Sequence, residues 1–308
     1  MNQQQSTSHI LMIRPVNFGF NEQTAESNAF QNSAAKTDDA NAIARREFDA
    51  MVKLLRANGV DVTVVDDTPE PYTPDSIFPN NWVSFHSDGQ VFLYPMQAQN
   101  RRLERREDII NGLEDNFAVK HVIDLSRFED EGKFLEGTGS MVLDRENQIA
   151  YACISPRTDR DVLELFCKEA GYKPVTFDAV DEKGQAIYHT NVLMCLGSGF
   201  ATICIDSIAN PHEKVMVKES LWSTQKEIID ISFEQMNHFA GNMLEVKNKD
   251  GETLIVMSKS AHDALREDQK KVLSGYGKLV YADISTIESL GGGSARCMMA
   301  EVHLPFGV

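Results

Sequence analysis

Apolar and polar positions follow a hairpin pattern that recurs along the chain. A β-type apolar run, a Gly- or Asn-containing turn and a second β-type run occur together four times. These segments are NNWVSFHSDGQVFLYP, GTGSMVLDRENQIAYACI, HTNVLMCLGSGFATICI and GNMLEVKNKDGETLIVM. The residues just before the first apolar runs are Asn81, Ser140, Asn191 and Asn242, at steps of 59, 51 and 51 residues. One more step of similar size reaches Ser294, so SARCMMAEVHLP is a fifth copy.

Helical patterns and short strands separate the hairpins. We expect helices over residues 44–58, 101–113, 158–170 and 261–273, followed by the strands VDVTVVD, VKHVIDL, KPVTFD and KLVYADI. The fourth copy is irregular, with weak periodicity over 206–226 and EIIDIS as its strand. HILMIRP has no helix before it, and we expect it to complete the fifth unit. The sequence thus predicts five α/β units in ββαβ order that close into a ring, with residues 9–308 as one domain.

Ring closure would bring chemically useful residues from equivalent loops to a shared axis. The candidates are Asp75 with Asn81, then Glu136, His189 with Asn191, Asn242, and Cys297. A thiolate is a nucleophile, and a histidine can protonate a leaving group and then deprotonate water. Two buried carboxylates without a protein cation beside them favour a cationic, planar guanidinium ligand. The predicted reaction is attack of sulfur on an amidino carbon, loss of an amine, and hydrolysis of the adduct.

Each candidate also has a purely structural interpretation. Most free cysteines are core fillers, and the asparagines can simply cap turns. We weigh turn capping equally with substrate contact for Asn81 and Asn191, and favour it for Asn242. Equivalent repeat positions favour catalysis for Cys297, with Gly291–Gly293 allowing close approach to a ligand. The other cysteines, Cys153, Cys167, Cys195 and Cys204, lie in apolar patterns that predict core packing.

Composition narrows the class of protein. The net charge of −16 argues against nucleic acid and anionic membranes as partners. The basic run Arg101, Arg102, Arg105 and Arg106 alternates with acids, which predicts a solvated helix face. Scattered cysteines and histidines argue against a metal site, and the odd cysteine count fits a reducing cytoplasm. Residues 1–8 are polar, and we expect a disordered leader.

The motifs PDSIFPNNW, LEGTGSMVLD, YHTNVLM, FAGNMLEV and GGGSARCMMAEV resemble, in this order, those of the amidinotransferase superfamily of guanidine-modifying enzymes. This superfamily includes arginine deiminase, dimethylarginine dimethylaminohydrolase and glycine amidinotransferase. The resemblance implies the pentein fold, a five-bladed α/β-propeller. It also implies Cys297 as nucleophile, His189 as catalytic histidine, and Asp75 and Glu136 as carboxylates that bind the guanidino group. No cofactor or metal is implied.

Two departures bear on the substrate. Arginine deiminase carries an aspartate where this chain has Asn191, and a neutral amide suits a ureido group better than an acid does. Several relatives carry Arg-Asp where this chain has Asp75-Ser76. The early segment RPVNFGFNEQTAESNAFQ is similar to that of bacterial citrulline-utilising hydrolases. Citrulline, a methylated arginine and arginine therefore all stay open as substrates.

The long polar segment 16–43 predicts a lid over the mouth of the site, with Asn17 or Asn21 touching the substrate. We expect a cytoplasmic hydrolase of a small guanidino or ureido amino acid, for which a homodimer is a possible assembly. An amidinotransferase would use the same catalytic residues, so the sequence does not separate the two. A non-catalytic binding protein of this fold is a third hypothesis, disfavoured because cysteine, histidine and acid occur together.

Overall fold

The computed structural model describes residues 3–25, 28 and 30–307. Within them lie five three-stranded sheets with a common topology. In each sheet a central strand pairs antiparallel with one neighbour and parallel with the other. The strands are β3 (Val83–Phe85), β4 (Gln90–Leu93) and β5 (His121–Asp124); β6 (Val142–Asp144), β7 (Ile149–Cys153) and β8 (Lys173–Phe177); β9 (Met194–Leu196), β10 (Phe200–Ile203) and β11 (Glu227–Asp230); β12 (Leu244–Lys247), β13 (Thr253–Ser258) and β14 (Lys278–Ala282); and β15 (Ala300–Glu301), β1 (His9–Arg14) and β2 (Asp61–Asp66).

The fifth sheet joins the two ends of the chain, as predicted. Strand β1 pairs antiparallel with β15, with Ile10 opposite Glu301, and parallel with β2. The first strands of successive units also touch: β15 contacts β3, β6 contacts β9, and β9 contacts β12. Residues that precede these first strands are therefore brought towards one another from distant parts of the sequence.

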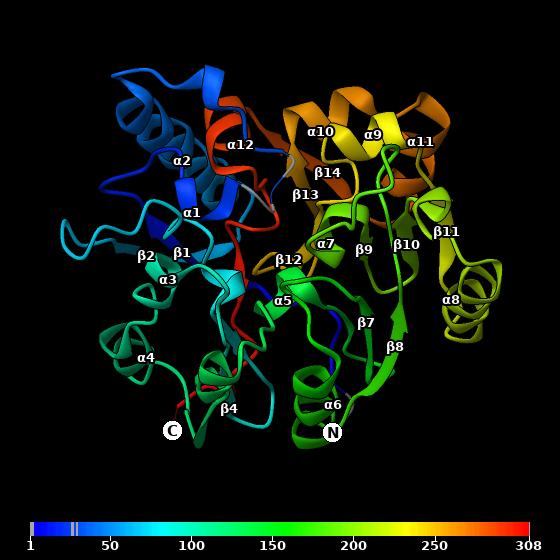
Figure 1. Cartoon of the computed structure of the whole chain (residues 1–308), viewed down its shortest axis with the longest axis horizontal. Helices are drawn as coiled ribbons and strands as arrows, with labels where there is room; N and C mark the ends of the chain where they lie inside the picture. Colours follow the sequence, from blue (N-terminus) through cyan, green and yellow to red (C-terminus); the bar gives the residue numbers. More distant parts are fainter. Residues whose placement is uncertain (1–2, 26–27, 29, 308) are drawn as a thin grey trace.

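The longer helices lie at the outside of the molecule, whereas α5 and α7 lie near its centre (Figure 1). Their bounds are α1 (Glu22–Ala25), α2 (Ala40–Ala57), α3 (Gln99–Arg102), α4 (Glu107–Leu113), α5 (Gly137–Ser140), α6 (Arg160–Ala170), α7 (Thr190–Leu193), α8 (Pro211–Ser223), α9 (Phe233–Asn237), α10 (Lys259–Ala264), α11 (Glu267–Tyr276) and α12 (Ser285–Gly291). Short 3-10 helices are η1 (Ser33–Ala35), η2 (Pro79–Asn81), η3 (Ser126–Glu131) and η4 (Ile205–Ser207).

Amphipathic spacing explains why α2 and α6 form where they were expected. On α2, Phe48, Met51 and Leu55 fall on one face and are completely buried. Burying each such side chain stabilises the fold by about 1.5–3 kcal/mol. Two other predicted helices are wrong in outline, because 101–113 divides into α3 and α4, and 261–273 divides into α10 and α11.

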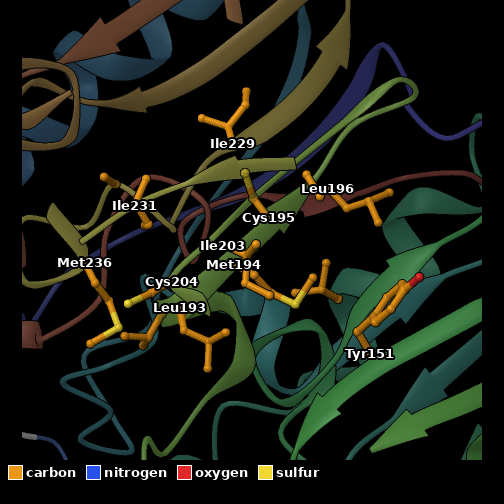
Figure 2. Close-up of a cluster of buried hydrophobic side chains, with 14 of the residues drawn as sticks. Tyr151, Leu193, Met194, Cys195, Leu196, Ile203, Cys204, Ile229, Ile231 and Met236 are labelled. Carbon is orange, nitrogen blue, oxygen red and sulfur yellow. The ribbon is translucent and has the colours of Figure 1, made fainter. Parts of the chain in front are cut away.

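The four cysteines predicted to pack in the hydrophobic core all lie there, and Figure 2 shows Cys195 and Cys204. Cys195 and Cys204 are buried beside Met194, Ile203 and Ile229. Cys153 and Cys167 are buried as well. Burial raises the pKa of Cys153 to about 12 and that of Cys195 to about 11, so these thiols stay protonated at neutral pH.

The expected disordered leader is wrong for residues 3–8, whereas residues 1 and 2 lie outside the described part of the chain. Gln5 is buried, donating from Nε2 to the carbonyl of Leu143 at 2.9 Å and accepting from the backbone N–H of Arg145 at 2.8 Å. Thr7 donates to the carbonyl of Val302. Polar side chains can be ordered when they satisfy buried backbone groups, and hydropathy alone does not reveal this.

Candidate active site

Cys297 lies in a tight turn directly before β15. The turn is closed by a hydrogen bond from its backbone N–H to the carbonyl of Ser294 at 3.0 Å. The side chain is 6% exposed. Its Sγ lies 3.4 Å from Nδ2 of Asn191 and 3.3 Å from Nδ2 of Asn242. The fifth unit therefore presents its thiol to amides contributed by the third and fourth units.

Single helical turns precede the first strands of the second and third units, and they position the acid and the histidine. Glu136 directly precedes α5, and His189 directly precedes α7. Both turns are closed in the same way, because the backbone N–H of the residue just after the helix donates to the carbonyl of the first helical residue. The same local geometry thus orients Glu136 and His189 in neighbouring units, as expected from their repeat positions.

His189 and Glu136 form a buried pair, with 2.8 Å between His189 Nε2 and Glu136 Oε2. Burial lowers the pKa of His189 to about 4, so the imidazole is neutral at pH 7 and donates from Nε2 to the carboxylate. Burial alone would raise the pKa of Glu136. The charge of Arg157 and the His189 hydrogen bond outweigh it and hold that pKa well below its usual range. Glu136 is therefore an ionised group that fixes the histidine ring.

Gly139 on α5 leaves the space that this pair needs. A Cβ at position 139 would lie 2.5 Å from Asn81 Nδ2 and 2.8 Å from His189 Nδ1. Asn81 itself lines the site, and its Oδ1 accepts a hydrogen bond from Arg101 Nη1 at 2.8 Å. A glycine is thus required here for close packing of three units, not for backbone conformation.

Asp75 is buried in the wall of the site, where it is 2% exposed. Its Oδ2 accepts from Asn21 Nδ2 at 2.7 Å, whereas its Oδ1 has no hydrogen-bond partner within the described part of the chain. Burial raises the pKa of Asp75, and the charge of Arg101 offsets this only in part. A buried carboxylate oxygen without a donor is costly and points to a ligand with N–H groups.

Two arginines flank the carboxylates, contrary to the expectation that no protein cation lies beside them. Arg101 is 2% exposed, with its Nε 3.8 Å from Asp75 Oδ2 and 2.9 Å from Glu104 Oε1. Arg157 Nη1 lies 3.5 Å from Glu136 Oε2, and its guanidinium lies 4.8 Å from the ring centroid of Tyr188. The predicted solvated helix face is therefore wrong for Arg101, because the chain turns after α3 and directs this residue inward.

These residues surround a small cavity of about 20 Å³. Its lining comes from widely separated parts of the chain: Asn28, Asp75, Phe78, Asn81, Arg101, Arg157, Tyr188, His189, Gly291, Gly292, Gly293 and Cys297. A space of this size holds about one water molecule. The two side chains predicted to meet, Cys297 and His189, thus line one cavity, and its volume in this structure is too small for an amino acid.

The segment predicted as a lid lies against this cavity, although its residues 26, 27 and 29 lie outside the described part of the chain. Asn21 and Thr24 contact Asp75, and Asn28 Nδ2 donates to the carbonyl of Gly292 at 3.3 Å. Asn17 is not at the site. Its Nδ2 donates to the carbonyl of Pro69 at an exposed position, so the predicted role of Asn17 is wrong and Asn21 lies at the site in its place.

Two further observations concern other kinds of site. Among the described residues, no three histidine, cysteine or acidic side chains are grouped so that they could hold a metal ion. No helix in the described ranges is both long and apolar enough to cross a membrane.

Comparison with known proteins gave one family and several similar folds. A family model described as N,N dimethylarginine dimethylhydrolase, eukaryotic, matches residues 14–304. The structure is similar to that of ArgZ, an arginine dihydrolase from the ornithine-ammonia cycle in cyanobacteria. The TM-score is 0.75 at 18% identity, and the match covers 96% of this chain and 41% of that chain. No curated protein matches the sequence.

The N-terminal domain of ArgZ, in a structure with bound substrate, also gives a TM-score of 0.75 at 18% identity, over 96% of this chain and 98% of that chain. DDAH from Pseudomonas aeruginosa, as a mutant complexed with citrulline, gives 0.67 at 17% identity, over 96% of this chain and 99% of that chain. The chain therefore spans about two fifths of full-length ArgZ but nearly all of its N-terminal domain, and it shares their mixed α/β fold.

Proposed function

The chain belongs to the family described as eukaryotic N,N dimethylarginine dimethylhydrolase, and from this premise we propose that it hydrolyses a guanidino or ureido group of an arginine-like amino acid through Cys297. One observation carries the proposal. Cys297, His189 and Asp75 face the same cavity, and Asp75 keeps one buried oxygen without a donor. A thiol, a histidine and an open carboxylate suit the attack of sulfur on the carbon of an amidino group.

The geometry supports a distinct task for each residue. Asp75 Oδ1 accepts N–H groups of the substrate, which orients the amidino plane over Cys297 Sγ. The thiol proton passes to His189 as sulfur attacks the central carbon, and His189 delivers it to the departing nitrogen. In the second half, His189 takes a proton from water, whose oxygen attacks the same carbon. The carbon–sulfur bond then breaks, and His189 returns the proton to the sulfur. Glu136 stabilises the imidazolium that forms in each half.

The two arginines support an amino-acid substrate. The guanidino or ureido group of the substrate has no negative charge that an arginine could bind. Nevertheless Arg101 and Arg157 both line the cavity, which suits the α-carboxylate of an amino acid. Arg101 is largely committed to Glu104 and Asn81. Arg157 contacts the carbonyl of Thr24 on the lid segment at 3.2 Å. The α-carboxylate of the substrate pairs with Arg157 when this segment moves away.

The small volume of the cavity supports a movement of segment 16–43 that admits substrate. A space of about 20 Å³ is too small for any amino acid. The contacts to be broken include those of Asn21 and Thr24 with Asp75, that of Asn28 with Gly292, and that of Arg157 with the Thr24 carbonyl. When they open, Asp75 Oδ2 becomes a second acceptor for the substrate. The segment thus acts as a lid that exchanges its own amide donors for those of the ligand.

The five sheets support a further proposal about architecture. We propose that they form the five blades of an α/β-propeller, in one catalytic domain over residues 9–308. The equal sheet topology and the pairing of β1 with β15 support it. In this arrangement the residues before each first strand share one axis, which is where the cavity lies.

A product screen tests the proposed function. Arginine, citrulline, dimethylarginine and agmatine are incubated separately with the full chain, and ammonia, urea, amines and the amino-acid product are measured. We expect turnover of at least one compound with an α-carboxylate, and much weaker turnover of agmatine, which lacks it. Turnover that requires an added amine acceptor would identify an amidinotransferase instead. No turnover of any compound would contradict the proposal.

A further inference from the structure

Asn242 occupies in the fourth unit the position that Asn191 occupies in the third, and it contacts the reacting sulfur. We propose that Asn242 is a catalytic residue whose amide stabilises the thiolate of Cys297. The proposal rests on the proposed function only for the identity of the nucleophile. Its evidence is the hydrogen-bond geometry of the amide and the backbone that positions it.

The orientation of the Asn242 amide is fixed by its other partners. Nδ2 donates to the carbonyl oxygen of Asn191 at 2.9 Å, and Oδ1 accepts from the backbone N–H of Arg296 at 3.0 Å. An amide rotated by half a turn would place oxygen against the Asn191 carbonyl and N–H against N–H at Arg296. The second proton of Nδ2 is therefore directed to Cys297 Sγ, which lies 3.3 Å away.

The two asparagine amides can form hydrogen bonds with the sulfur of Cys297 in both of its protonation states. As a thiolate, Sγ accepts from Asn242 Nδ2 at 3.3 Å and from Asn191 Nδ2 at 3.4 Å. As a thiol, it can donate to Asn242 Oδ1 at 3.7 Å. Hydrogen bonds to a charged acceptor are stronger than those between neutral groups, so the pair of donors favours the thiolate. The neutral His189 supplies no positive charge for this purpose at pH 7.

The backbone around Asn242 is built for close approach to the third unit. A Cβ at Gly241 would lie 2.5 Å from the carbonyl oxygen of Val192 and 2.8 Å from the carbonyl carbon of Leu193. Phe239 adopts a positive φ of 62°, which is uncommon for a bulky residue, and its carbonyl accepts the N–H of Asn242 at 2.8 Å. The strained backbone at Phe239 and the absence of a side chain at Gly241 together place this amide beside the sulfur.

The reactivity of Cys297 towards iodoacetamide, measured against pH without substrate, tests the proposal. The variants are Asn242→Ala, which removes the amide, and Asn242→Asp, which places a carboxylate beside the sulfur. Rates are divided by the alkaline plateau of each variant, so that differences in lid opening cancel, and peptide mapping restricts the signal to Cys297. The groups that face the sulfur from other elements, Asp75, Arg101, Arg157, Tyr188 and His189, are the same in every variant.

We expect the Asn242→Ala profile to shift by about one pH unit to the alkaline side, with reactivity at pH 7 reduced on the order of tenfold. Asn242→Asp should shift further, because its charge repels the thiolate. This nearly isosteric variant also carries the test if the alanine variant does not fold.

Asn248→Ala is the matched control, because Asn248 is buried in the same unit and bonds to Glu252 in the hairpin turn, away from the sulfur. Its profile should superimpose on that of the wild-type protein. The proposal is overturned if the Asn242 variants also superimpose, or if Asn248→Ala shifts as far as they do. Since no substrate is present, a failed product screen leaves this result unaffected, and an active enzyme can still contradict it.

Discussion

Two regions of this molecule carry nearly the same set of buried charges, and only one of them has the features of an active site. At the cavity, Glu136 contacts His189, Arg157 and Arg101. Next to β15, Glu301 contacts His303 at 3.2 Å, Arg296 at 2.8 Å and Arg145 at 3.6 Å. Each region has one carboxylate, one histidine and two arginines.

The electrostatic consequences are also alike. Burial lowers the pKa of His303 to about 4, as it does for His189. At Glu301, burial alone would raise the pKa, but the charges of Arg145 and Arg296 outweigh it and hold that pKa below its usual range, as happens at Glu136. Perturbed titration therefore does not distinguish a catalytic cluster from a structural one.

The difference lies in what adjoins each cluster. The Glu136 cluster borders a cavity that also contains Cys297 and the open oxygen of Asp75. None of the four residues of the Glu301 cluster lines that cavity. A thiol and an unsatisfied acceptor in a shared space, and not the charges themselves, distinguish the proposed site from the Glu301 cluster. The following changes test this comparison.

The largest effect is expected from the nucleophile. Cys297→Ala should reduce kcat at least 10³-fold, because loss of a covalent nucleophile removes the reaction path. Cys167→Ala removes another buried thiol, which lies in the core and not at the cavity. It should keep kcat within about threefold while lowering the free energy of unfolding by about 1 kcal/mol for the cavity created. Initial rates and denaturant unfolding measure both, and similar rate losses in the two variants would contradict the assignment.

The two glutamates provide the direct comparison of the clusters. Glu136→Gln should reduce kcat by 10²-fold or more, because the imidazolium loses its stabilising charge. Glu301→Gln should leave the kcat of folded protein within a few-fold but reduce the free energy of unfolding by about 3–5 kcal/mol, because two arginines lose their buried partner. Rate measurements normalised to folded protein separate the two outcomes. Equal rate losses would show that the two regions do not differ in function.

Alanine substitutions at two glycines, one at the cavity and one away from it, should have smaller effects. Gly139→Ala should lower kcat by about 10–100-fold, since a Cβ there displaces Asn81 or His189 from the catalytic arrangement. Gly251 has a positive φ of 81° and open space around it. Gly251→Ala should cost about 1–2 kcal/mol of stability and leave kcat unchanged. If both variants lost only stability, Gly139 would have no part in positioning the site.

The smallest effect concerns pH. His189 and His303 each have a pKa of about 4 in the folded chain and 6.5 when unfolded, so the unfolded chain binds protons first as pH falls. The part of the unfolding free energy that comes from the neutral histidines is fully present above about pH 6.5. It is lost as the pH falls towards 4, by about 1.4 kcal/mol per pH unit for each histidine. Unfolding free energies at pH 7 and pH 5 should therefore differ less in His303→Asn than in the wild-type protein. An unchanged difference would contradict the neutral, buried state of His303.

The repeat pattern in the sequence predicted that Cys297, His189 and Asp75 lie together, and all three line one cavity. Position within a unit fixes which loop a residue occupies, so Cys297, His189 and Asp75 could be expected to meet before any coordinates were known. The closing strand β1 followed from the same reasoning, because an unpaired strand at one end needs a partner at the other.

The cations were missed because their direction depends on tertiary structure. Arg101 is buried on α3, where the predicted helix 101–113 divides, and a mixed charge pattern gives no sign of this division or of the burial. Arg157 follows a hairpin in a segment without apolar periodicity. The one available signal was energetic: two buried carboxylates need nearby positive charge, which was assigned entirely to the ligand.

Asn17 and Asn242 illustrate the limit of residue type as evidence. Both are asparagines without a distinguishing local pattern, and the predictions for them were wrong for Asn17 and incomplete for Asn242, whose amide does bond turn backbone at Arg296. Asn17 binds the Pro69 carbonyl at the surface, whereas Asn242 bonds turn backbone as expected and also contacts the sulfur. The register of a long loop and the orientation of an amide are set by neighbours that sequence patterns do not specify.

The most direct test of the central claim is acid quenching of the wild-type protein during turnover, followed by peptide mass spectrometry. We predict a substrate-derived amidino or ureido adduct on the peptide that contains Cys297, and its absence from the peptides of Cys153, Cys167, Cys195 and Cys204. Turnover without any adduct, together with full activity of Cys297→Ala, would contradict the account.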